Sequence, residues 1–367
     1  MIPVNEPLLN GNEKKYLAEC IDTGWISSEG PFIKKFEDEF AVKVGRQHAV
    51  AVCNGTAALE IAIEALGIGQ GDEVIIPAFT IISCASAIVK MGAVPVLVDS
   101  DATTWNMDVS QIEKKITKKT KAIMAVHIYG LPVDMDPLLA IAKKHGLKII
   151  EDAAEAHGQT YKGKSCGSFG DISVFSFYPN KLITTGEGGM VVMNDTMLAE
   201  KCRSLRNLCF VAGKRFVHEE LGWNMRMTNI QAALGLAQLE RWDEHIARKR
   251  AIGKLYHSLL AGAKNIVLPL PSTDHAENIY WVFGILLRNG MDAEAVTKKL
   301  AEKQIATRPF FYPMHLQPVF QKKGWYKKEN YPVAEDLYKH GFYVPSGLTL
   351  TDEQIRTVSQ ALLEIVE

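Results

Sequence analysis

The stretch that decides the fold reads Ser176-Phe177-Tyr178-Pro179-Asn180-Lys181-Leu182-Ile183-Thr184-Thr185-Gly186-Glu187-Gly188-Gly189. It begins inside an apolar run, residues 172–177, that has the composition of a buried strand. A lysine placed where such a strand opens into a Gly-rich loop can be desolvated, which lowers its pKa and frees the amine. Lys181 is therefore a candidate for a Schiff base with an aldehyde, which is the chemistry of pyridoxal phosphate enzymes.

On both sides of this stretch, short apolar runs alternate with segments of helical spacing. Strands are expected at residues 74–76, 94–98, 122–126, 148–151 and 172–177, and residues 188–193 are a candidate for one more, at an edge or antiparallel. Helical spacing lies between them, as in Leu59, Ile63 and Leu66. This alternation predicts an α/β fold with a mostly parallel central sheet flanked by helices.

The second half of the chain predicts a long helix and a smaller domain. Residues 227–260 have a mostly helical pattern, and the remainder combines a strand-like run at 280–287 with helices from about Asp292 and from Asp352. We therefore expect a large cofactor-binding domain over residues 1–250 and a small C-terminal α+β domain over residues 251–367. Because no Gly/Ser-rich linker separates them, the two domains should pack closely.

Composition excludes several classes of protein. The 367 residues are 47% hydrophobic, and 41 basic against 42 acidic residues give a net charge of -1, so neither nucleic acid nor a membrane surface is an expected partner. Six scattered cysteines without ligand spacing predict separate thiols in a reducing compartment, and the histidines predict no metal site. Without a visible signal peptide or a membrane-length apolar run, a cytoplasmic protein is expected.

Three positions could complete a cofactor site around Lys181. Asp152 follows a buried strand at its carboxyl end, where ligands bind in open α/β sheets, and its carboxylate could hold a protonated pyridine nitrogen. An ordinary helix-capping role explains Asp152 equally well. The helix start at Gly55, Thr56 and Ala57 favours a phosphate, and Ser176 could add a hydroxyl, although capped helix starts and buried strand serines are common.

Other groups have less specific patterns. The Gly-rich loop 186–189 is neither a Walker A loop nor a G-x-G-x-x-G loop, so an NTPase or a dehydrogenase has little support. Three further segments are either structural turns or walls of a site, and their candidate residues are Trp25 and Ser27, then Asn224 and Arg226, then Arg308, Tyr312 and His315.

The chain resembles the DegT/DnrJ/EryC1 sugar aminotransferases, a branch of the fold-type I pyridoxal phosphate enzymes, essentially from end to end. The residues that carry the resemblance are 24–30 (Gly-Trp-Ile-Ser-Ser-Glu-Gly), 54–59 (Asn-Gly-Thr-Ala-Ala-Leu), 71–75, 151–156 (Glu-Asp-Ala-Ala-Glu-Ala), 176–189, 224–229 (Asn-Met-Arg-Met-Thr-Asn) and Arg308-Pro309. Within the family, the chain resembles most the branch that forms GDP-perosamine. It departs from that branch in the loop 207–214 and at Tyr312, where those enzymes usually have His.

The resemblance implies a role for each matching residue. Lys181 would bind pyridoxal phosphate covalently and then move the proton, while Asp152 would pair with the ring nitrogen. The other cofactor contacts would be Glu155 near the ring hydroxyl, Ala154 and Ile81 on the two ring faces, Gly55, Thr56, Ala57 and Ser176 on the phosphate, and Asn224 from a partner subunit. Many relatives have an aromatic residue where this chain has Ile81.

The same resemblance implies the reaction. The enzyme would move an amino group from L-glutamate, through pyridoxamine phosphate, to a nucleotide-linked 4-keto-6-deoxy sugar for surface polysaccharide such as O-antigen, and it would be a homodimer with shared active sites. Substrate contacts would come from Trp25, Ser27, Tyr178, Arg226, Arg308, Tyr312 and His315. Two alternatives remain open, a dehydratase or isomerase using the same cofactor and a non-catalytic regulator. Dehydratase relatives have His at the position of Lys181, which favours transamination.

Overall fold

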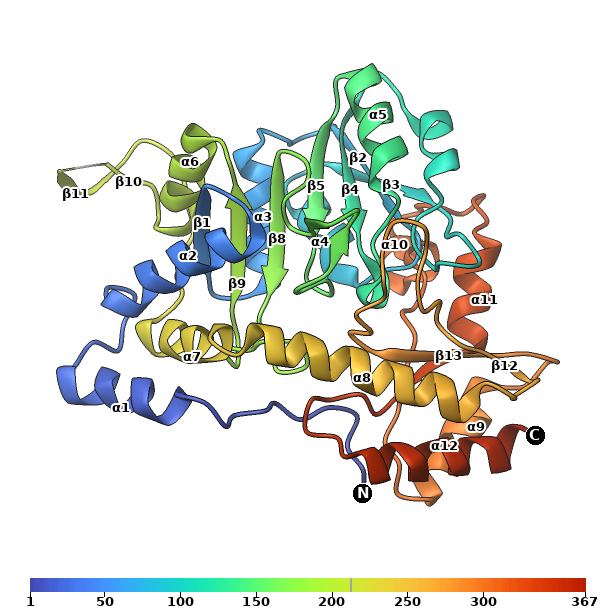
Figure 1. Ribbon diagram of the computed structural model, residues 1–367. Helices are drawn as coiled ribbons and strands as arrows, with labels where there is room; N and C mark the ends of the chain where they lie inside the picture. The colour runs from blue at the N-terminus through green and yellow to red at the C-terminus, as the bar shows by residue number, and fades with distance from the viewer. Residues whose placement is uncertain (212) are drawn as a thin grey trace.

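A seven-stranded sheet organises the large domain in the computed structural model, which describes residues 1–211 and 213–367 (Figure 1). Its order is β1-β9-β8-β5-β4-β2-β3, and β9 is antiparallel to both of its neighbours whereas the other pairs are parallel. The strands are β1 (His48–Val52), β2 (Glu73–Pro77), β3 (Val94–Val98), β4 (Thr120–Val126), β5 (Lys148–Asp152), β8 (Ile172–Ser176) and β9 (Gly189–Met193).

The predicted strands are present, with one difference in placement. Residues 189–193 do form an antiparallel strand, but this strand lies inside the sheet, because β1 pairs with its outer side. The sequence pattern did not single out β1, whose short run His48–Val52 alternates alanine with valine. A mostly parallel α/β sheet is confirmed.

Helices cover both faces of this sheet. Alternate residues of β1 show the division, since Val50 and Val52 pack in one core cluster and Ala49 and Ala51 in another. The first face carries α3 (Gly55–Ala65), α4 (Ile82–Lys90) and α6 (Thr196–Arg206); the second carries α2 (Pro31–Val44), α5 (Met135–His145) and α7 (Asn229–Leu239), with α1 (Glu13–Thr23) packed on α7.

The long helix expected over residues 227–260 is broken into two. The first part, α7, begins with a capping box between Thr228 and Gln231, and α8 (Trp242–Leu260) follows after two residues. The break turns the Trp242 ring into the core against Phe40. Below the sheet in Figure 1, α8 then continues into the C-terminal part of the chain.

A four-stranded antiparallel sheet organises the small domain, in the order β12-β13-β15-β14. Its strands are β12 (Ile266–Val267), β13 (Phe283–Leu287), β14 (Arg308–Pro309) and β15 (Gly341–Val344), and its helices are α9 (Ala293–Glu302), α10 (Pro318–Lys322), α11 (Pro332–His340) and α12 (Asp352–Val366). The expected domain boundary at residue 250 falls inside α8, and the division at that residue stays a prediction.

Two small hairpins and several short helical turns complete the chain. The hairpins are β6 (Thr160–Tyr161) with β7 (Lys164–Ser165) and β10 (Phe210–Val211) with β11 (Lys214–His218); the 3₁₀ turns are η1 (Val109–Gln111), η2 (Glu113–Lys115), η3 (Ile128–Gly130) and η4 (Met314–Leu316). The β10–β11 hairpin projects from the body of the molecule beside α6 (Figure 1). Across the described ranges, no helix has both the length and the hydropathy needed to cross a bilayer. All six cysteines carry free thiols.

Candidate active site

A cavity of about 640 Å³ opens beside Asp152 at the end of β5, Ser176 at the end of β8 and the N-terminus of α3. These are the carboxyl ends of parallel strands, where an open α/β sheet binds its ligands. The cavity collects most of the residues predicted from the sequence, namely Gly55, Thr56, Ala57, Ile81, Asp152, Ala154, Glu155, Ser176, Tyr178 and Lys181.

Lys181 lies in the interior of this cavity. Its side chain is 11% exposed, and its Nζ is 3.8 Å from Oε1 of Glu155 and 3.7 Å from the centroid of the Trp281 ring. Burial lowers the pKa of the Lys181 amine, and the charges of Glu155 and Asp152 only partly oppose this shift. The amine is thus available as a nucleophile and proton carrier at lower pH than a surface lysine would be.

Glu155 is the acidic neighbour of Lys181. Burial raises the pKa of Glu155 to about 7, although the nearby Lys181 charge lowers it. Its Oε2 accepts a hydrogen bond of 2.9 Å from the backbone N–H of Tyr129, which stands in the left-handed region with φ of 56°. A tyrosine is strained in that conformation, and the buried ring of Tyr129 is held by Phe310 and Phe311 at centroid distances of 4.9 and 5.2 Å.

Asp152 is followed by turns and not by a helix, so the helix-capping role considered for it is wrong. Its Oδ1 accepts a hydrogen bond of 3.0 Å from the N–H of Ala154, two residues on, as in an Asx-turn. Its Oδ2 accepts one of 3.3 Å from the thiol of Cys84, and burial raises the pKa of the carboxyl. These two bonds orient a buried carboxylate that lines the cavity.

The start of α3 is built for close approach of an anion. Asn54 caps the helix by accepting a hydrogen bond of 2.8 Å from Ala57 N–H, and the first amides of any helix lack an intrahelical acceptor. A Cβ at Gly55 would lie 2.7 Å from the Cβ of Ser176, so only glycine allows β8 to pass so near. The hydroxyls of Thr56 and Ser83, 3.0 Å apart, lie on the same wall.

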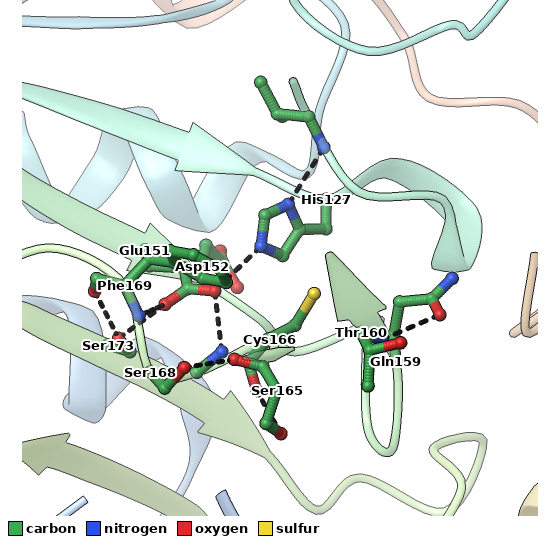
Figure 2. Close-up of polar contacts among 12 residues, drawn as sticks. His127, Glu151, Asp152, Gln159, Thr160, Ser165, Cys166, Ser168, Phe169 and Ser173 are labelled. Atoms are coloured by element: carbon green, nitrogen blue, oxygen red, sulfur yellow. Dashed lines mark hydrogen bonds and ion pairs between the residues drawn. The ribbon is translucent and has the colours of Figure 1, made fainter. Parts of the chain in front are cut away.

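A buried polar network supports the strand end that carries Asp152. Figure 2 shows His127 and Glu151 pointing toward each other, with 2.9 Å between His127 Nε2 and Glu151 Oε1. Glu151 also accepts hydrogen bonds from Gly167 N–H, Phe169 N–H and the Ser173 hydroxyl. These contacts lower the pKa of Glu151 against the effect of its burial, so a fixed charge is held directly next to Asp152 in the chain.

The atoms of this network are already used, which argues against a metal there. The ligand atoms of His127, Glu151 and Cys166 lie within 4.8 Å of one another. However, Nδ1 of His127 accepts a hydrogen bond of 3.2 Å from Val133 N–H, which leaves the proton on Nε2, the nitrogen that faces Glu151. With its Nε2 lone pair absent and both Glu151 oxygens occupied, the cluster has the bonding of a structural network.

The predicted substrate residues Trp25, Ser27 and Arg226 and the predicted cofactor residue Asn224 do not line the cavity, although Met225 does. Trp25 and Ser27 are exposed, and their carbonyls are held by Asn229, whose side-chain and backbone N–H groups donate at 2.7 Å to each. Asn224 is exposed, and Arg226 donates hydrogen bonds to Ser28 and Asn207.

The three candidates from the 308–315 segment separate in space. Arg308 is exposed and lines a second cavity of about 500 Å³, which shares Tyr178, Asn180, Trp281 and Tyr343 with the first. Tyr312 is partly exposed and packs against Tyr338. His315 is 2% exposed, and its Nε2 lies 3.1 Å from Glu335, so it is a core residue in this chain and does not reach either cavity.

The residues present fit pyridoxal phosphate. Two buried carboxylates, Asp152 and Glu155, face the single ammonium of Lys181, so a protonated ring nitrogen beside Asp152 would balance the charge. The helix start at Gly55 and the hydroxyl of Ser176 lie on the wall of the same cavity, where a phosphate would be received.

Sequence reasoning did not identify several residues of this site. Cys84, Tyr129, His127 and Trp281 all contact or support Lys181, Asp152 or Glu155. The only local signal would have been that Glu151 and His127 are polar residues inside or at the end of apolar strands. Trp281 and Tyr129 reach the site through tertiary packing, which their sequence neighbours do not reveal.

Comparisons with known proteins agree with this geometry. Residues 7–363 match the DegT/DnrJ/EryC1/StrS aminotransferase family. The chain is 47% identical over 363 residues to a GDP-perosamine synthase of Escherichia coli O157:H7, with 99% of this chain and 98% of the relative covered. It is 44% identical over 369 residues to the GDP-perosamine synthase of Vibrio cholerae, with 99% and 98% covered.

Solved structures with the same fold include enzymes of this chemistry. The sugar aminotransferase Spr1654 from Streptococcus pneumoniae, in its PMP form, superposes with a TM-score of 0.93 at 28% identity, covering 100% of this chain and 99% of that one. DesV from S. venezuelae superposes with a TM-score of 0.91 at 35% identity, covering 97% and 94%.

Proposed function

The chain belongs to the DegT/DnrJ/EryC1/StrS aminotransferase family, and from this premise we propose that it transfers the amino group of L-glutamate to carbon 4 of a nucleotide-linked 4-keto-6-deoxy sugar. It is a pyridoxal phosphate-dependent sugar aminotransferase. The observation that carries the proposal is the buried amine of Lys181, which faces two carboxylates inside a cavity of about 640 Å³. Relatives that make GDP-perosamine support a GDP-linked acceptor and a role in surface polysaccharide synthesis.

The cofactor would be held at three points by residues of this chain. Bound there, pyridoxal phosphate supplies an aldehyde that takes up the amino group and a pyridine ring that withdraws electrons. We assign Asp152 to the ring nitrogen, Glu155 to the side of the ring hydroxyl and Gly55, Thr56, Ala57 and Ser176 to the phosphate. Ala154 and Ile81 would contact the two ring faces.

Lys181 would carry the proton in both halves of the reaction. Its Nζ can remove the α-proton of glutamate as a neutral amine and deliver a proton at the sugar carbon as an ammonium. The Glu155 carboxylate, 3.8 Å away, stabilises the ammonium between these steps. The Trp281 ring covers the amine on another side, which keeps bulk water from competing for the proton.

Among the substrate contacts, Tyr178 and Arg308 have the best support. Tyr178 is 49% exposed and lines both cavities, so it stands where a substrate enters. Arg308 has the charge to receive a carboxylate or a phosphate in the second cavity. We infer that Trp25, Ser27, Arg226 and Tyr312 contact substrate only from a face shared with a second subunit. For His315, the buried position supports a packing role and not a substrate contact.

A homodimer with shared sites would explain several exposed residues. Leu221 is 93% exposed, and Trp25 and Ile26, both 49% exposed, add apolar surface that a lone chain leaves in water. Asn224 is exposed away from its own cavity, which suits a contact with the phosphate of a partner's cofactor.

The shared site has a direct test. Lys181→Ala and Asn224→Ala dimers should each be impaired, yet mixed and reassociated they should regain about one quarter of wild-type activity, because half of the dimers then hold one intact site. No recovery after verified subunit exchange would contradict a shared site.

The reaction itself is tested by colour and by product mass. Purified protein should be yellow, and glutamate should bleach it. Incubation with GDP-linked and dTDP-linked 4-keto-6-deoxy sugars should yield a product in which an amino group replaces the keto oxygen. A product that loses a hydroxyl without gaining nitrogen would point to a dehydratase, and failure of every amino donor to bleach the protein would point to a non-catalytic binder.

A further inference from the structure

Besides the reactive lysine, a second lysine is buried. Lys249, in the middle of α8, is 2% exposed, and its Nζ donates hydrogen bonds of 2.7 Å to the carbonyl of Trp281 and 2.6 Å to the carbonyl of Ser346. Its ammonium has no charged neighbour that shifts it; burial alone lowers its pKa to about 7. A buried ammonium held only by backbone carbonyls is costly, which calls for an explanation.

Lys249 holds the backbone of Trp281, a residue that contacts the reactive lysine. Trp281 is the residue whose ring centroid lies 3.7 Å from the Nζ of Lys181. The ring is fixed at its far end as well, because its Nε1 donates a hydrogen bond of 2.8 Å to the carbonyl of Asn180, the residue before Lys181. Trp281 is thus tied by its backbone to Lys249 and by its indole to the loop of the reactive lysine.

A small cavity of about 10 Å³ is shared by Lys249 and Glu155, the carboxylate beside Lys181. It is lined by Lys249, Trp281, Glu155, His157, Leu182 and Ile279. The titratable groups that face Lys249 across it are therefore Glu155, the acidic neighbour of Lys181, and His157, whose pKa burial lowers to about 3, so that it adds no charge near neutral pH. Lys249 therefore lines the same small cavity as the carboxylate that neighbours Lys181.

From this arrangement, and building on the function proposed above, we propose that Lys249 is a positioning residue for Lys181. By fixing the Trp281 carbonyl, it keeps the indole ring over the reactive amine and so maintains the desolvation of that amine. It also joins three segments, because α8, residue 281 and residue 346 all meet at its Nζ. Movement of α8 or of the 346 segment would consequently be transmitted to the reactive amine.

The chain offers a matched control on the same helix. Tyr256 is also fully buried in α8, and its hydroxyl donates a hydrogen bond of 2.7 Å to the carbonyl of Pro345, the neighbour of Ser346. Tyr256→Phe therefore removes a buried side-chain bond to the same segment without touching Trp281. Lys249→Met removes bonds to both. Any effect common to the two variants belongs to general packing, and any effect of Lys249→Met alone belongs to Trp281.

The experiment measures the titration of Lys181 itself. Full-length protein, freed of cofactor by glutamate treatment and dialysis, is labelled with acetic anhydride over a range of pH, and the Lys181 peptide is quantified by mass spectrometry. We expect the Lys181 midpoint in Lys249→Met to rise toward that of an ordinary lysine, with roughly a threefold to tenfold smaller fraction of neutral amine near neutral pH. Tyr256→Phe should keep the wild-type midpoint.

Two further variants check that the label reports on Lys181 and test the Trp281 ring directly. Glu155→Gln removes the carboxylate beside the ammonium and must lower the Lys181 midpoint, which shows that the label reports this site. Trp281→Leu removes the ring but keeps the backbone carbonyl, so it tests the ring even if Lys249→Met does not fold. We expect access of water to raise the midpoint by more than loss of the cation–π contact lowers it. An unchanged midpoint in Trp281→Leu, or an equal rise in Lys249→Met and Tyr256→Phe, would overturn the proposal.

Discussion

Two lysines line the same cavity and differ in their exposure to water. Lys181, on the cavity floor with Asp152 and Glu155, is 11% exposed and lies 3.8 Å from its nearest carboxylate. Lys90, on the rim with Glu187, Tyr178 and Ile81, is 57% exposed and forms a direct ion pair of 2.6 Å with Glu60. The two amines thus differ in their exposure to water, although each has a carboxylate nearby. Lys181 is buried without a close ion pair, and this burial lowers the pKa of its amine.

The largest expected difference between floor and rim is in turnover. Lys181→Ala should lower kcat by on the order of 10⁴-fold or more, because we propose that the same side chain is nucleophile and proton carrier. Lys90→Ala should lower it by less than about threefold, since the Lys90 side chain is 57% exposed and has no part in the proposed reaction. Steady-state kinetics with glutamate measures both. If Lys90→Ala lowered kcat nearly as much as Lys181→Ala, the expected difference between floor and rim would be wrong.

The next largest difference is expected between two carboxylates of the cavity, Asp152 and Glu187, in their effect on kcat. Asp152→Asn keeps the shape but removes the buried charge that we assign to the ring nitrogen of the cofactor, so kcat should fall by about 10²- to 10³-fold. Glu187→Gln, on the exposed rim, should change kcat by less than about threefold. Single-turnover bleaching with glutamate isolates the first half-reaction. If the Asp152→Asn protein bleaches as fast as the wild type, the assignment of Asp152 to the ring nitrogen is wrong.

Acid stability tests His157, which lines the small cavity shared by Glu155 and Lys249. His157 is buried between aromatic rings, and burial lowers its pKa to about 3, whereas the unfolded chain has the ordinary value. As pH falls below the ordinary histidine pKa, only the unfolded state takes up the proton, so stability is lost as pH decreases toward the folded pKa. Between neutral pH and about pH 5, wild type should lose about 2 kcal/mol more than His157→Phe.

Urea unfolding of cofactor-free protein at the two pH values measures that loss. Comparing each protein with itself removes the packing cost of the substitution. Equal losses in the wild type and in His157→Phe would show that His157 is protonated in the folded state.

The smallest effects are expected in the outer cavity. Arg308→Ala should raise a substrate KM by about tenfold with little change in kcat, because a contact made equally in the ground state and the transition state affects binding alone. His315→Ala should leave KM unchanged and lower the melting temperature, since His315 is a core residue paired with Glu335. The opposite pattern, with KM raised by His315→Ala and not by Arg308→Ala, would reverse the roles given to the two residues.

The sequence could predict the cavity better than the loops outside it. Lys181, Asp152 and Gly55 stand at strand ends and a helix start, and the rules for parallel sheets place such residues at one edge. Trp25 and Arg226 stand in loops outside the cavity, and the substrate contacts proposed for them depend on a second subunit, which sequence rules for a single chain do not place. His315 was expected to face substrate because of its aromatic and polar neighbours, but it packs in the core.

The fold shows the same division. The central sheet followed from strand patterns, whereas the break between α7 and α8 did not, because it depends on Trp242 packing against Phe40 in three dimensions. Trp281 and Tyr129 were missed for the same reason. Their contacts join residues far apart in the chain, and the periodicity of a sequence predicts only local structure.

The strained turn at Tyr129 has a consequence for biosynthesis. The rings that hold Tyr129 include Phe310, Phe311 and Tyr343, which are translated long after it. A nascent chain emerging from the ribosome therefore lacks the support for the N–H that binds Glu155 until its last strand is released. The hydrogen bond from Tyr129 to Glu155, the acidic neighbour of Lys181, can therefore be supported only after the last strand has been synthesised.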